Sequence, residues 1–402
     1  MGRKIECQLV LEDSNVSREH VEVRIEGHTV LLRDLGSRNG TYVNGHVVKD
    51  AEVELQVDAI IRLGGYIFAL VEDVAAYVAG FQGLPLAGGP KLAGVRRAIA
   101  QFGQGRMPTL IGGETGSGKE VVARLIHEAS GRTGAFIAVN CGAIPENLVE
   151  SEFFGFARGA FSGSDRARDG LFRAADKGTL FLDELGELSL EAQAKLLRAT
   201  ESGEVRPVGF DKPVFVEVRL VAATHRDLGE RVTAGKFRED LFFRLSAAKI
   251  ELPPLRSRRE DIPKLCKILQ EETPLEFQAK AMERLVVWDY PGNVRELRHV
   301  LSQARAAVIA AGAARVALEH LPERILGPLP PPSATQESES PTGTRPNVVL
   351  LALDPGVRRS QLEEALTKHK GNMVRVAKEL GLARSSLYDE LKKAGLDATQ
   401  YR

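Results

Sequence analysis

This sequence is poor in cysteine and in long apolar runs. Its 402 residues include three cysteines, Cys7, Cys141 and Cys266, which lie far apart with no Cys-x-x-Cys pair. This pattern argues against a disulfide framework or a zinc site and fits a reducing compartment. The apolar run at 348–353 is far shorter than the ~20 residues that a membrane-spanning helix needs, and residues 1–4 begin no signal peptide. We therefore expect a cytoplasmic protein with no membrane partner.

An excess of charge of either sign is also absent. Lys plus Arg and Asp plus Glu are 54 each, so the formal net charge is +0. Global charge therefore predicts neither nucleic-acid binding nor attraction to a membrane, and any charged patch must be local. A chain of 402 residues is too long for a single core and predicts two or three domains.

The first 72 residues indicate an all-β module. Short alternating strands, such as Val21–Ile25 and Ile60–Leu63, are separated by the turn pairs Asn39-Gly40 and Asn44-Gly45. Residues 73–90 are expected to be a linker.

Residues 91–254 change to an α/β pattern. The apolar segment Thr109–Gly112 is followed by a helix to Ala129 and by a second apolar segment, Phe136–Val139. Strands that alternate with helices predict a parallel sheet. The apolar spacing then becomes helical over residues 255–326, which predicts a helical subdomain.

The remaining residues contain a second linker and a small helical domain. Residues 327–347 are rich in Pro, Ser and Thr without periodicity, which predicts a flexible linker that we place at 327–355. Residues 356–402 open with a capping box from Ser360 to Glu363, and Gly371 and Gly381 stand where helices would end. We expect three short helices there.

A glycine-rich segment predicts a nucleotide site. Gly113-Glu-Thr-Gly-Ser-Gly118-Lys119 follows a predicted strand and opens a predicted helix. In this context backbone N–H groups cradle phosphates, and the lysine reaches the β- and γ-phosphates. Glu120 stands where Ser or Thr usually offers Mg²⁺ a hydroxyl, so the metal must depend on other ligands.

Two carboxylates elsewhere in the sequence offer a metal ligand in place of the missing hydroxyl. Thr179-Leu-Phe-Leu-Asp183-Glu184 is an apolar strand that ends in an acidic pair. A buried parallel strand delivers its carboxyl-terminal residues into the ligand crevice. We expect Asp183 to hold Mg²⁺ and Glu184 to polarise the attacking water. An acidic surface turn is the alternative interpretation.

Several further segments resemble the AAA+ domains of sigma-54-dependent activators, in the same order along residues 91–325. They are Val139-Asn-Cys141, Gly159-Ala-Phe-Ser-Gly-Ser164, Phe237-Arg-Glu-Asp-Leu-Phe-Phe-Arg-Leu245, Leu252-Pro-Pro-Leu-Arg256 and Tyr290-Pro-Gly-Asn-Val-Arg-Glu-Leu297. The resemblance implies that Asn140 is a switch residue that senses the γ-phosphate through Glu184. It also implies that Arg238 and Arg244 are fingers that reach a neighbour's nucleotide, and that Arg295 is a sensor in the helical lid.

The residues expected to bind ATP come from the loop, from one strand end and from the lid. They are Gly113, Glu114, Thr115, Gly116, Ser117, Gly118, Lys119, Glu120, Thr224, His225 and Arg295. His225 stands where the family usually has Asn, so we expect altered rather than abolished sensing. For Arg238 and Arg244 the alternative role is a surface salt bridge with Glu239 or Asp240.

The segment Gly159-Ala160-Phe161-Ser162-Gly163-Ser164 is similar to the loop with which this family engages sigma-54. The resemblance implies that Phe161 makes the contact. Ser162 and Ser164 replace the usual Thr and Ala, so the strength of remodelling can differ. A flexible hairpin with a locally packed aromatic is the alternative.

The β module resembles a forkhead-associated (FHA) domain. The resemblance rests on Gly2-Arg3, Val16-Ser-Arg-Glu-His20, Asp34-Leu-Gly-Ser-Arg-Asn-Gly-Thr41 and Val43-Asn-Gly45. Such domains bind phosphothreonine peptides, and arginine and hydroxyl donors suit a dianionic phosphate. The implied phosphopeptide residues are Arg3, Ser17, Arg18, Arg38 and Asn39, with His20 as a structural support. The family has two strands before Gly-Arg, so we expect a sandwich without its first strands and with exposed sheet edges.

The segment from Gly371 to Lys393 resembles a Fis-type helix-turn-helix. Helices are expected over 372–380 and 384–394, and residues 356–402 carry ten Lys/Arg against six Asp/Glu, a net of +4. The implied DNA contacts lie at the start of the recognition helix: Arg384, Ser385, Ser386 and Tyr388. Asp389 and Glu390 replace a basic pair common there, so operator preference can differ. A small three-helix dimerisation domain is the alternative.

Together these features predict a multidomain protein: an FHA-like β sandwich, an AAA+ P-loop domain with a helical lid, and a three-helix DNA-binding domain. The expected partners are ATP, Mg²⁺, sigma-54 RNA polymerase holoenzyme, upstream DNA and a phosphothreonine-containing protein. The expected assembly is a homo-oligomer, a hexameric ring. A general AAA+ remodelling ATPase with another client, and a signalling adaptor with a weak or dead ATPase, are the competing hypotheses.

Overall fold

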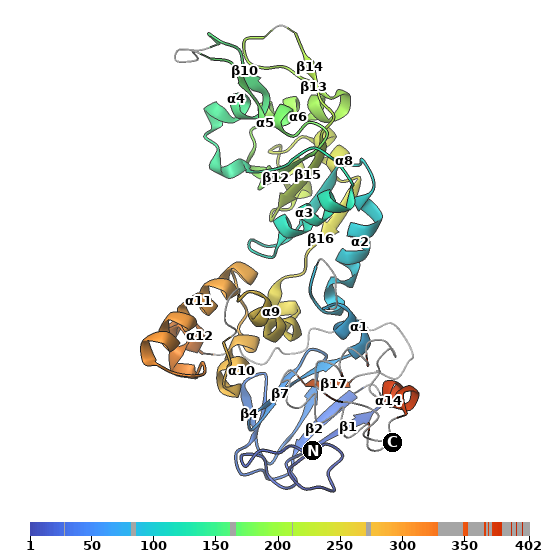
Figure 1. Ribbon diagram of the computed structural model, residues 1–402, viewed down its shortest axis with the longest axis vertical. Helices are drawn as coiled ribbons and strands as arrows, with labels where there is room; N and C mark the ends of the chain where they lie inside the picture. The colour runs from blue at the N-terminus through green and yellow to red at the C-terminus, as the bar shows by residue number, and fades with distance from the viewer. Residues whose placement is uncertain are drawn as a thin grey trace. The chain divides into compact units, whose positions relative to one another are not determined.

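The computed structural model describes most of the chain. The described residues are 1–27, 29–81, 86–160, 166–210, 212–270, 275–328, 349–352, 366, 369, 372–379, 387, 391 and 396. The chain forms two compact units (Figure 1), one of residues 92–254 with 292–294, the other of the rest. Among the described residues no helix is both long and apolar enough to span a membrane.

The amino-terminal β module is a sandwich of two antiparallel sheets. One has the order β1-β2-β5, formed by β1 (Val21–Glu26), β2 (Thr29–Asp34) and β5 (Glu52–Leu55). The other has the order β17-β7-β6-β3-β4, formed by β3 (Thr41–Val43), β4 (His46–Val48), β6 (Ile60–Leu63), β7 (Tyr66–Val71) and β17 (Val349–Ala352). Leu32, Ile61 and Phe68 from the two sheets are fully buried in one shared core. The predicted all-β module is confirmed.

The outer edge of β7 is covered by an element that the sequence did not predict. Residues 349–352, which we expected to lie in a flexible linker, form β17 and pair antiparallel with β7. Leu351 and Ala352 are buried by this pairing. An apolar segment next to an unpaired strand edge gains both ladder hydrogen bonds and burial. The prediction of an irregular linker is therefore wrong for these four residues.

The second unit is an α/β layer structure built on one parallel sheet. The strand order is β16-β8-β15-β12-β9, formed by β8 (Thr109–Gly112), β9 (Phe136–Asn140), β12 (Thr179–Asp183), β15 (Arg219–Thr224) and β16 (Ala248–Glu251). Two small antiparallel pairs join β10 (Gly155–Phe156) to β11 (Arg168–Asp169) and β13 (Glu204–Val205) to β14 (Val214–Phe215). The predicted parallel α/β fold is confirmed.

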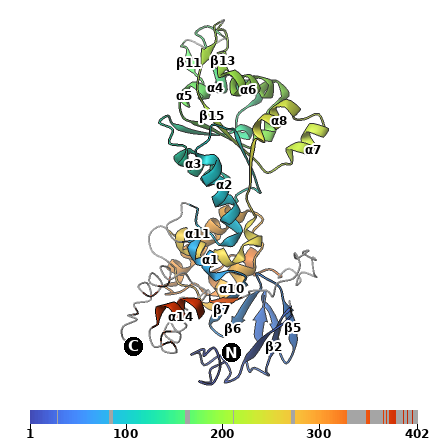
Figure 2. The ribbon, with the colours of Figure 1, turned by 90° about the vertical axis from the view of Figure 1, so that its right-hand side faces the viewer.

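Helices cover both faces of the parallel sheet (Figure 2). The helices α2 (Ala93–Gly103) and α3 (Lys119–Ala129) pack together, and α3 lies on β8, β12 and β15. Alternate side chains of the strands, such as Leu180 and Leu220, point into a separate core. That core is shared with α4 (Val149–Phe154), α5 (Leu171–Ala174), α6 (Leu190–Ser202), α7 (Leu228–Thr233) and α8 (Glu239–Leu245).

Helices also form in the predicted linker, in the predicted helical subdomain and in the carboxyl-terminal domain. The predicted linker at 73–90 contains α1 (Val74–Ala79), whose N-cap is Asp73. The predicted helical subdomain contains α9 (Ile262–Ile268), α10 (Ala279–Val287), α11 (Asn293–Ala311) and α12 (Glu323–Leu326), with short 3-10 turns that include η6 (Arg259–Asp261). In the carboxyl-terminal domain α14 (Met373–Glu379) lies within residues 372–380, where the first helix of the helix-turn-helix was expected.

Candidate functional site

The glycine-rich loop joins the end of β8 to the start of α3. Gly113, Gly116 and Gly118 have φ angles of 145°, 76° and 112°, which a side chain would strain. A Cβ at Gly113 would also lie 3.0 Å from the carbonyl oxygen of Leu252. The loop thus keeps open the backbone cradle that fits the phosphates of a nucleotide at a helix amino terminus.

Lys119 is the first residue of α3 and is 6% exposed. Its ammonium donates to the carbonyl oxygens of Gly113 at 2.9 Å and Glu114 at 3.3 Å. The cation therefore lies within the loop, where incoming phosphates can replace these carbonyl partners. The carboxylate of Glu120, the next residue, accepts a hydrogen bond from Arg124 at 2.8 Å.

The register of the sheet brings the other predicted residues to the same edge. Thr224 lies opposite Gly112 across the β15–β8 pair, and Asp183 lies opposite Asn140 across the β12–β9 pair. Carboxyl ends of parallel strands face one crevice, so the loop and the acidic pair meet there. Glu184 follows with φ 53° and ψ 45°, a left-handed conformation that is costly for a side chain with a Cβ.

Two depressions lie at this edge. A cavity of about 310 Å³ beside the loop is lined by Gly113, Glu114, Thr224 and His225 among others. A second depression is lined by Asn140, Glu184 and His225 among others. His225 borders both. The neighbouring Cys141 is buried, and burial raises the pKa of its thiol to about 12, so this thiol stays protonated near neutral pH.

The partner of Glu184 differs from the one that the resemblance implied. The Nδ1 atom of His225 lies 2.6 Å from a carboxylate oxygen of Glu184, whose side chain is 17% exposed. Asn140 instead accepts a hydrogen bond from the backbone N–H of Gly142 at 2.9 Å and caps a short turn. Glu184 thus contacts His225, and the role of Asn140 as a switch residue stays a prediction.

Sequence reasoning assigned no role to Asn293, although it lies in one of the segments quoted for the resemblance. It is fully buried with φ 51°. Its amide donates to the Glu114 carboxylate and to the Thr115 carbonyl oxygen, both at 3.1 Å, and the N–H of Val294 donates to the carbonyl oxygen of Gly116 at 3.0 Å. These bonds brace the phosphate loop from outside. The sequence offered only the residue type as a signal, because asparagine tolerates a left-handed backbone conformation better than most residues.

The two candidate arginine fingers lie at the surface on α8. Arg238 precedes the helix and pairs with Asp240 at 2.6 Å, both side chains being exposed. Arg244 donates to the carbonyl oxygen of Thr200 at 3.3 Å. Neither is among the described residues that line the two depressions. The salt bridge considered as an alternative for Arg238 is present, and a role in a neighbouring subunit stays a prediction.

Three loops of the β module carry the predicted phosphopeptide residues, and hydrogen bonds join them. The N–H of Arg3 donates to the carbonyl oxygen of Ser17 at 2.9 Å, and the N–H of Arg38 donates to the Ser17 hydroxyl at 3.0 Å. The side-chain amide of Asn39 donates to the carbonyl oxygen of Asn15 at 2.8 Å, just before the loop that carries Ser17. Arg3, Arg18, Arg38 and Asn39 are exposed, so four donors border one surface.

His20 is buried beneath these loops and forms hydrogen bonds with two of them. It is fully buried, and burial lowers the pKa of its imidazole. Its Nδ1 accepts from the N–H of Ser17 at 2.9 Å, so the neutral tautomer places the proton on Nε2, 3.3 Å from the carbonyl oxygen of Gly40. The expected structural role of His20 agrees with these contacts.

Other predicted residues lie outside this description. Phe161–Ser164 and the DNA-contact residues Arg384, Ser385, Ser386 and Tyr388 are outside the described residues. Of the predicted sigma-54 loop, residues 159–164, the structure describes only Gly159 and Ala160, and Gly159 has φ 79°. Arg295 follows Val294 on α11. In the carboxyl-terminal segment Leu387 and Leu391 are buried.

Comparison with protein families assigns a description to each part of the chain. Residues 1–64 match the FHA domain, residues 87–251 the Sigma-54 interaction domain, and residues 256–338 the AAA+ ATPase lid domain. Residues 359–393 match a family described as bacterial regulatory protein, Fis family. The four matches follow the order that the sequence motifs indicated.

Individual relatives agree with this assignment. The chain is 49% identical over 224 residues to the regulatory protein LuxO of Vibrio cholerae, which covers 54% of this chain and 42% of LuxO. It is 47% identical over 223 residues to the response regulator protein PilR of Pseudomonas aeruginosa, covering 54% of this chain and 50% of PilR. The chain thus spans about half the length of the curated relatives it matches.

Solved structures show the same architecture. NtrX from Brucella abortus in complex with ATP has a TM-score of 0.55 and 29% identity, covering 76% of this chain and 68% of NtrX. NtrX in complex with ADP gives a TM-score of 0.53 at 29% identity, covering 76% of this chain and 68% of NtrX. NtrX was thus solved with each of these two adenine nucleotides.

Proposed function

We infer that this chain, a member of the sigma-54-dependent activator family by its domain content, hydrolyses ATP to remodel the sigma-54 RNA polymerase holoenzyme and open promoters. The observation that best supports this is the meeting of the Lys119 loop with Asp183 and Glu184 at one sheet edge, within residues that match the Sigma-54 interaction domain. Phosphate cradle, lysine and acidic pair are the parts that phosphoryl transfer requires.

In this proposal the triphosphate lies in the loop 113–118, with the amino terminus of α3 and Lys119 stabilising its negative charge. Asp183 would hold Mg²⁺, an ion that uses few protein ligands. Bound there, it would supply neutralisation of the charge that develops on the phosphates. Glu184 accepts a hydrogen bond from the attacking water.

The remaining parts act around this centre. Arg238 and Arg244 complete the site of a neighbouring subunit, so hydrolysis depends on assembly into a hexameric ring. The segment 159–164 carries Phe161 to sigma-54, the carboxyl-terminal domain binds upstream DNA, and the FHA module binds a phosphothreonine-containing protein that sets assembly.

The test measures the ATPase rate against protein concentration for the wild type and Phe161→Ala, together with retention of each protein on sigma-54 in a nucleotide-trapped state. We expect the rate per subunit to rise with concentration in both proteins and sigma-54 retention to be lost in the variant alone. Unchanged retention in the variant, or none in either protein, would mean an AAA+ ATPase with another client.

His225 gives a second test of the proposed chemistry. Replacing it with alanine removes the charge-assisted hydrogen bond that fixes the Glu184 carboxylate, so we expect kcat to fall about tenfold with a smaller change in KM. The double variant with Glu184→Gln should be no slower than Glu184→Gln alone, because the two groups act as a unit. Steady-state kinetics of the four proteins check this, and additive losses would contradict it.

A further inference from the structure

The β module contains a buried arginine whose partner lies far away in the sequence. Arg62 is in the middle of β6, between fully buried Ile61 and Leu63, and is 6% exposed itself. Its guanidinium lies over the ring of Tyr42 on the neighbouring strand, 3.8 Å from the centroid. Its Nε donates to a carboxylate oxygen of Glu283 at 2.5 Å, across 221 residues. An arginine at such a site needs an anion, because a buried unpaired charge is costly.

Glu283 belongs to α10, in the segment that matches the AAA+ ATPase lid domain. It is 7% exposed, and its second carboxylate oxygen has no hydrogen-bond partner among the residues that the structure describes. Burial raises the pKa of Glu283, and the charge of Arg62 opposes that shift. Burying the charge of either residue would therefore be unfavourable without the other.

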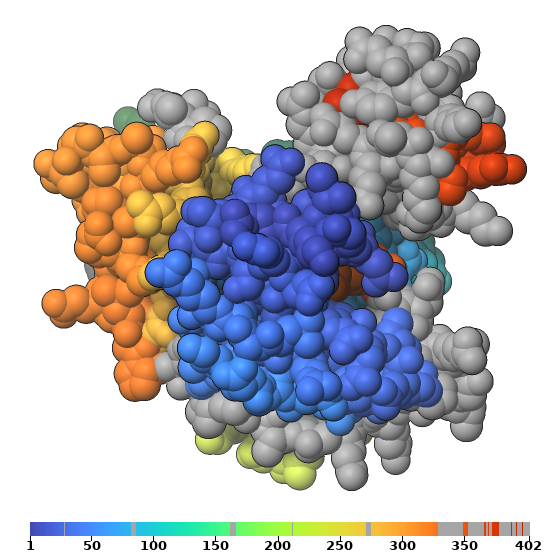
Figure 3. Space-filling view, turned by 90° about the horizontal axis from the view of Figure 1, so that it is seen from below, coloured from blue at the N-terminus to red at the C-terminus, as the bar shows by residue number. Residues whose placement is uncertain are grey.

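Backbone elements meet around this pair. Helix α10 contacts both β6 and β7, and Figures 1 and 3 show the yellow and orange lid segments lying against the blue β module. A buried ion pair adds little net stability compared with apolar side chains, but leaving one of its charges buried without the other is costly. The pair therefore disfavours arrangements in which β6 and α10 separate.

A second group of contacts joins the segment that follows β7 to the lid. After β7 the chain forms α1, and the hydroxyl of Tyr77 donates to the carbonyl oxygen of Glu260 in η6 at 2.9 Å. The N–H of Gly89 donates to the carboxylate of Asp261 at 2.7 Å. The ammonium of Lys264 on α9 lies 5.5 Å from the centre of the Tyr77 ring. The connecting segment is thus fixed to the lid, independently of the ion pair.

This docking surface adjoins the candidate phosphopeptide loops. Strand β3 begins at Thr41, directly after the loop that carries Arg38 and Asn39. The hydroxyl of Thr41 donates to Asp34 at 2.7 Å, and Asp34 also accepts from Ser37 in the same loop. The next residue along β3 is Tyr42, on which Arg62 lies. The phosphopeptide loop, β3 and the ion pair are therefore contiguous.

We propose that the surface formed by β6 and β7 is a binding surface for helix α10 of the same chain, and that the Arg62–Glu283 pair disfavours their separation. The surface connects the proposed phosphopeptide site to the lid of the proposed ATPase. The docking itself depends on neither activity, so it can be tested apart from both.

The experiment is hydrogen exchange of the full chain in four forms: wild type, Arg62→Met, Glu283→Leu and the double variant. We expect each single variant to speed exchange by roughly tenfold or more in both β6 (60–63) and α10 (279–287), since each leaves one charge buried alone. The double variant removes both charges and should recover part of the protection. Arg24→Met is the matched control, because Arg24 pairs with Glu52 at 2.5 Å on an exposed face of the same module.

A loss of protection confined to the module that carries the substitution would overturn the proposal, as would wild-type exchange in both segments. If Arg62→Met unfolds the β module altogether, Glu283→Leu remains decisive. That substitution lies in the lid, so faster exchange in β6 then reports docking alone. Additive effects of the two substitutions would also count against a shared pair.

Discussion

Replacing Glu184 with glutamine should slow ATP hydrolysis by at least about a hundredfold while nucleotide affinity changes little. The amide has the shape of the carboxylate but cannot accept a proton from the attacking water. The proposed nucleotide cradle consists of the loop 113–118 and Lys119, none of which this substitution changes. Steady-state ATPase rates, together with the equilibrium binding of a fluorescent ATP analogue, measure the two effects separately.

The control for this prediction is Glu191→Gln. Glu191 lies on α6, its side chain is 79% exposed, and its ion pair with Lys195 is a surface contact. Surface pairs of this kind contribute little, so the control should retain the wild-type rate. A normal rate in Glu184→Gln would refute the role assigned to Glu184. A parallel loss of affinity would mean that the substitution disturbs the cradle rather than the chemistry.

The parts of the site that sequence predicted are those that depend on local pattern. A glycine-rich loop between a strand and a helix and an acidic pair after an apolar strand each carry their own signal. The parallel sheet then brings them together, because the carboxyl ends of its strands share one edge. Asp183 and Thr224 reach that edge through the registers of β12 and β15, which follow from the same alternation of strands and helices.

The parts that sequence missed are pairings between distant segments. His225 and Glu184 are 41 residues apart, and no spacing rule joins them. Arg62 reads as an outward residue of a short strand until α10 covers it, and residues 349–352 read as linker until the edge of β7 is seen. In each case the pairing depends on which distant segments pack together in the folded chain, and a segment read alone does not reveal this.

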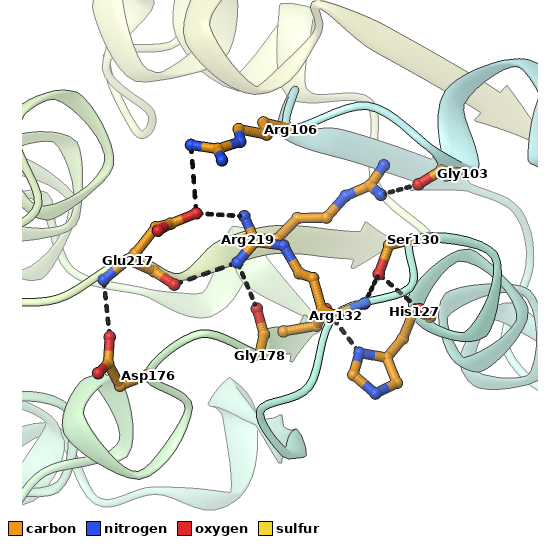
Figure 4. A network of polar contacts seen from close by, with 10 residues as sticks. Gly103, Arg106, His127, Ser130, Arg132, Asp176, Gly178, Glu217 and Arg219 are labelled. Carbon is orange, nitrogen blue, oxygen red and sulfur yellow. Dashed lines mark hydrogen bonds and ion pairs between the residues drawn. The ribbon is translucent and has the colours of Figure 1, made fainter.

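A buried arginine at the start of β15 provides the second large expected effect. Arg219 is 1% exposed, and its guanidinium donates to the carbonyl oxygen of Gly103 at the end of α2 (Figure 4). It also donates to the carbonyl oxygen of Phe102. Burial, and then the nearby charge of Arg132, lower the pKa of Arg219 to about 10. It remains a cation near neutral pH and satisfies carbonyl groups that a helix end leaves without internal partners.

Arg219→Met should therefore destabilise this region by about 3 kcal/mol, because methionine fills much of the volume but donates no hydrogen bond to the α2 carbonyl groups. Hydrogen exchange in α2 and β15 is the suitable measurement, since a chain of several domains has no single unfolding free energy. Arg106→Met is the matched control: Arg106 is in the same network, but its side chain is 82% exposed where it pairs with Glu217. Faster exchange in Arg219→Met alone would show that the buried cation holds α2 to the sheet. Equal exchange in both variants would mean that apolar packing suffices, and that the hydrogen bonds of Arg219 only offset the cost of burying it.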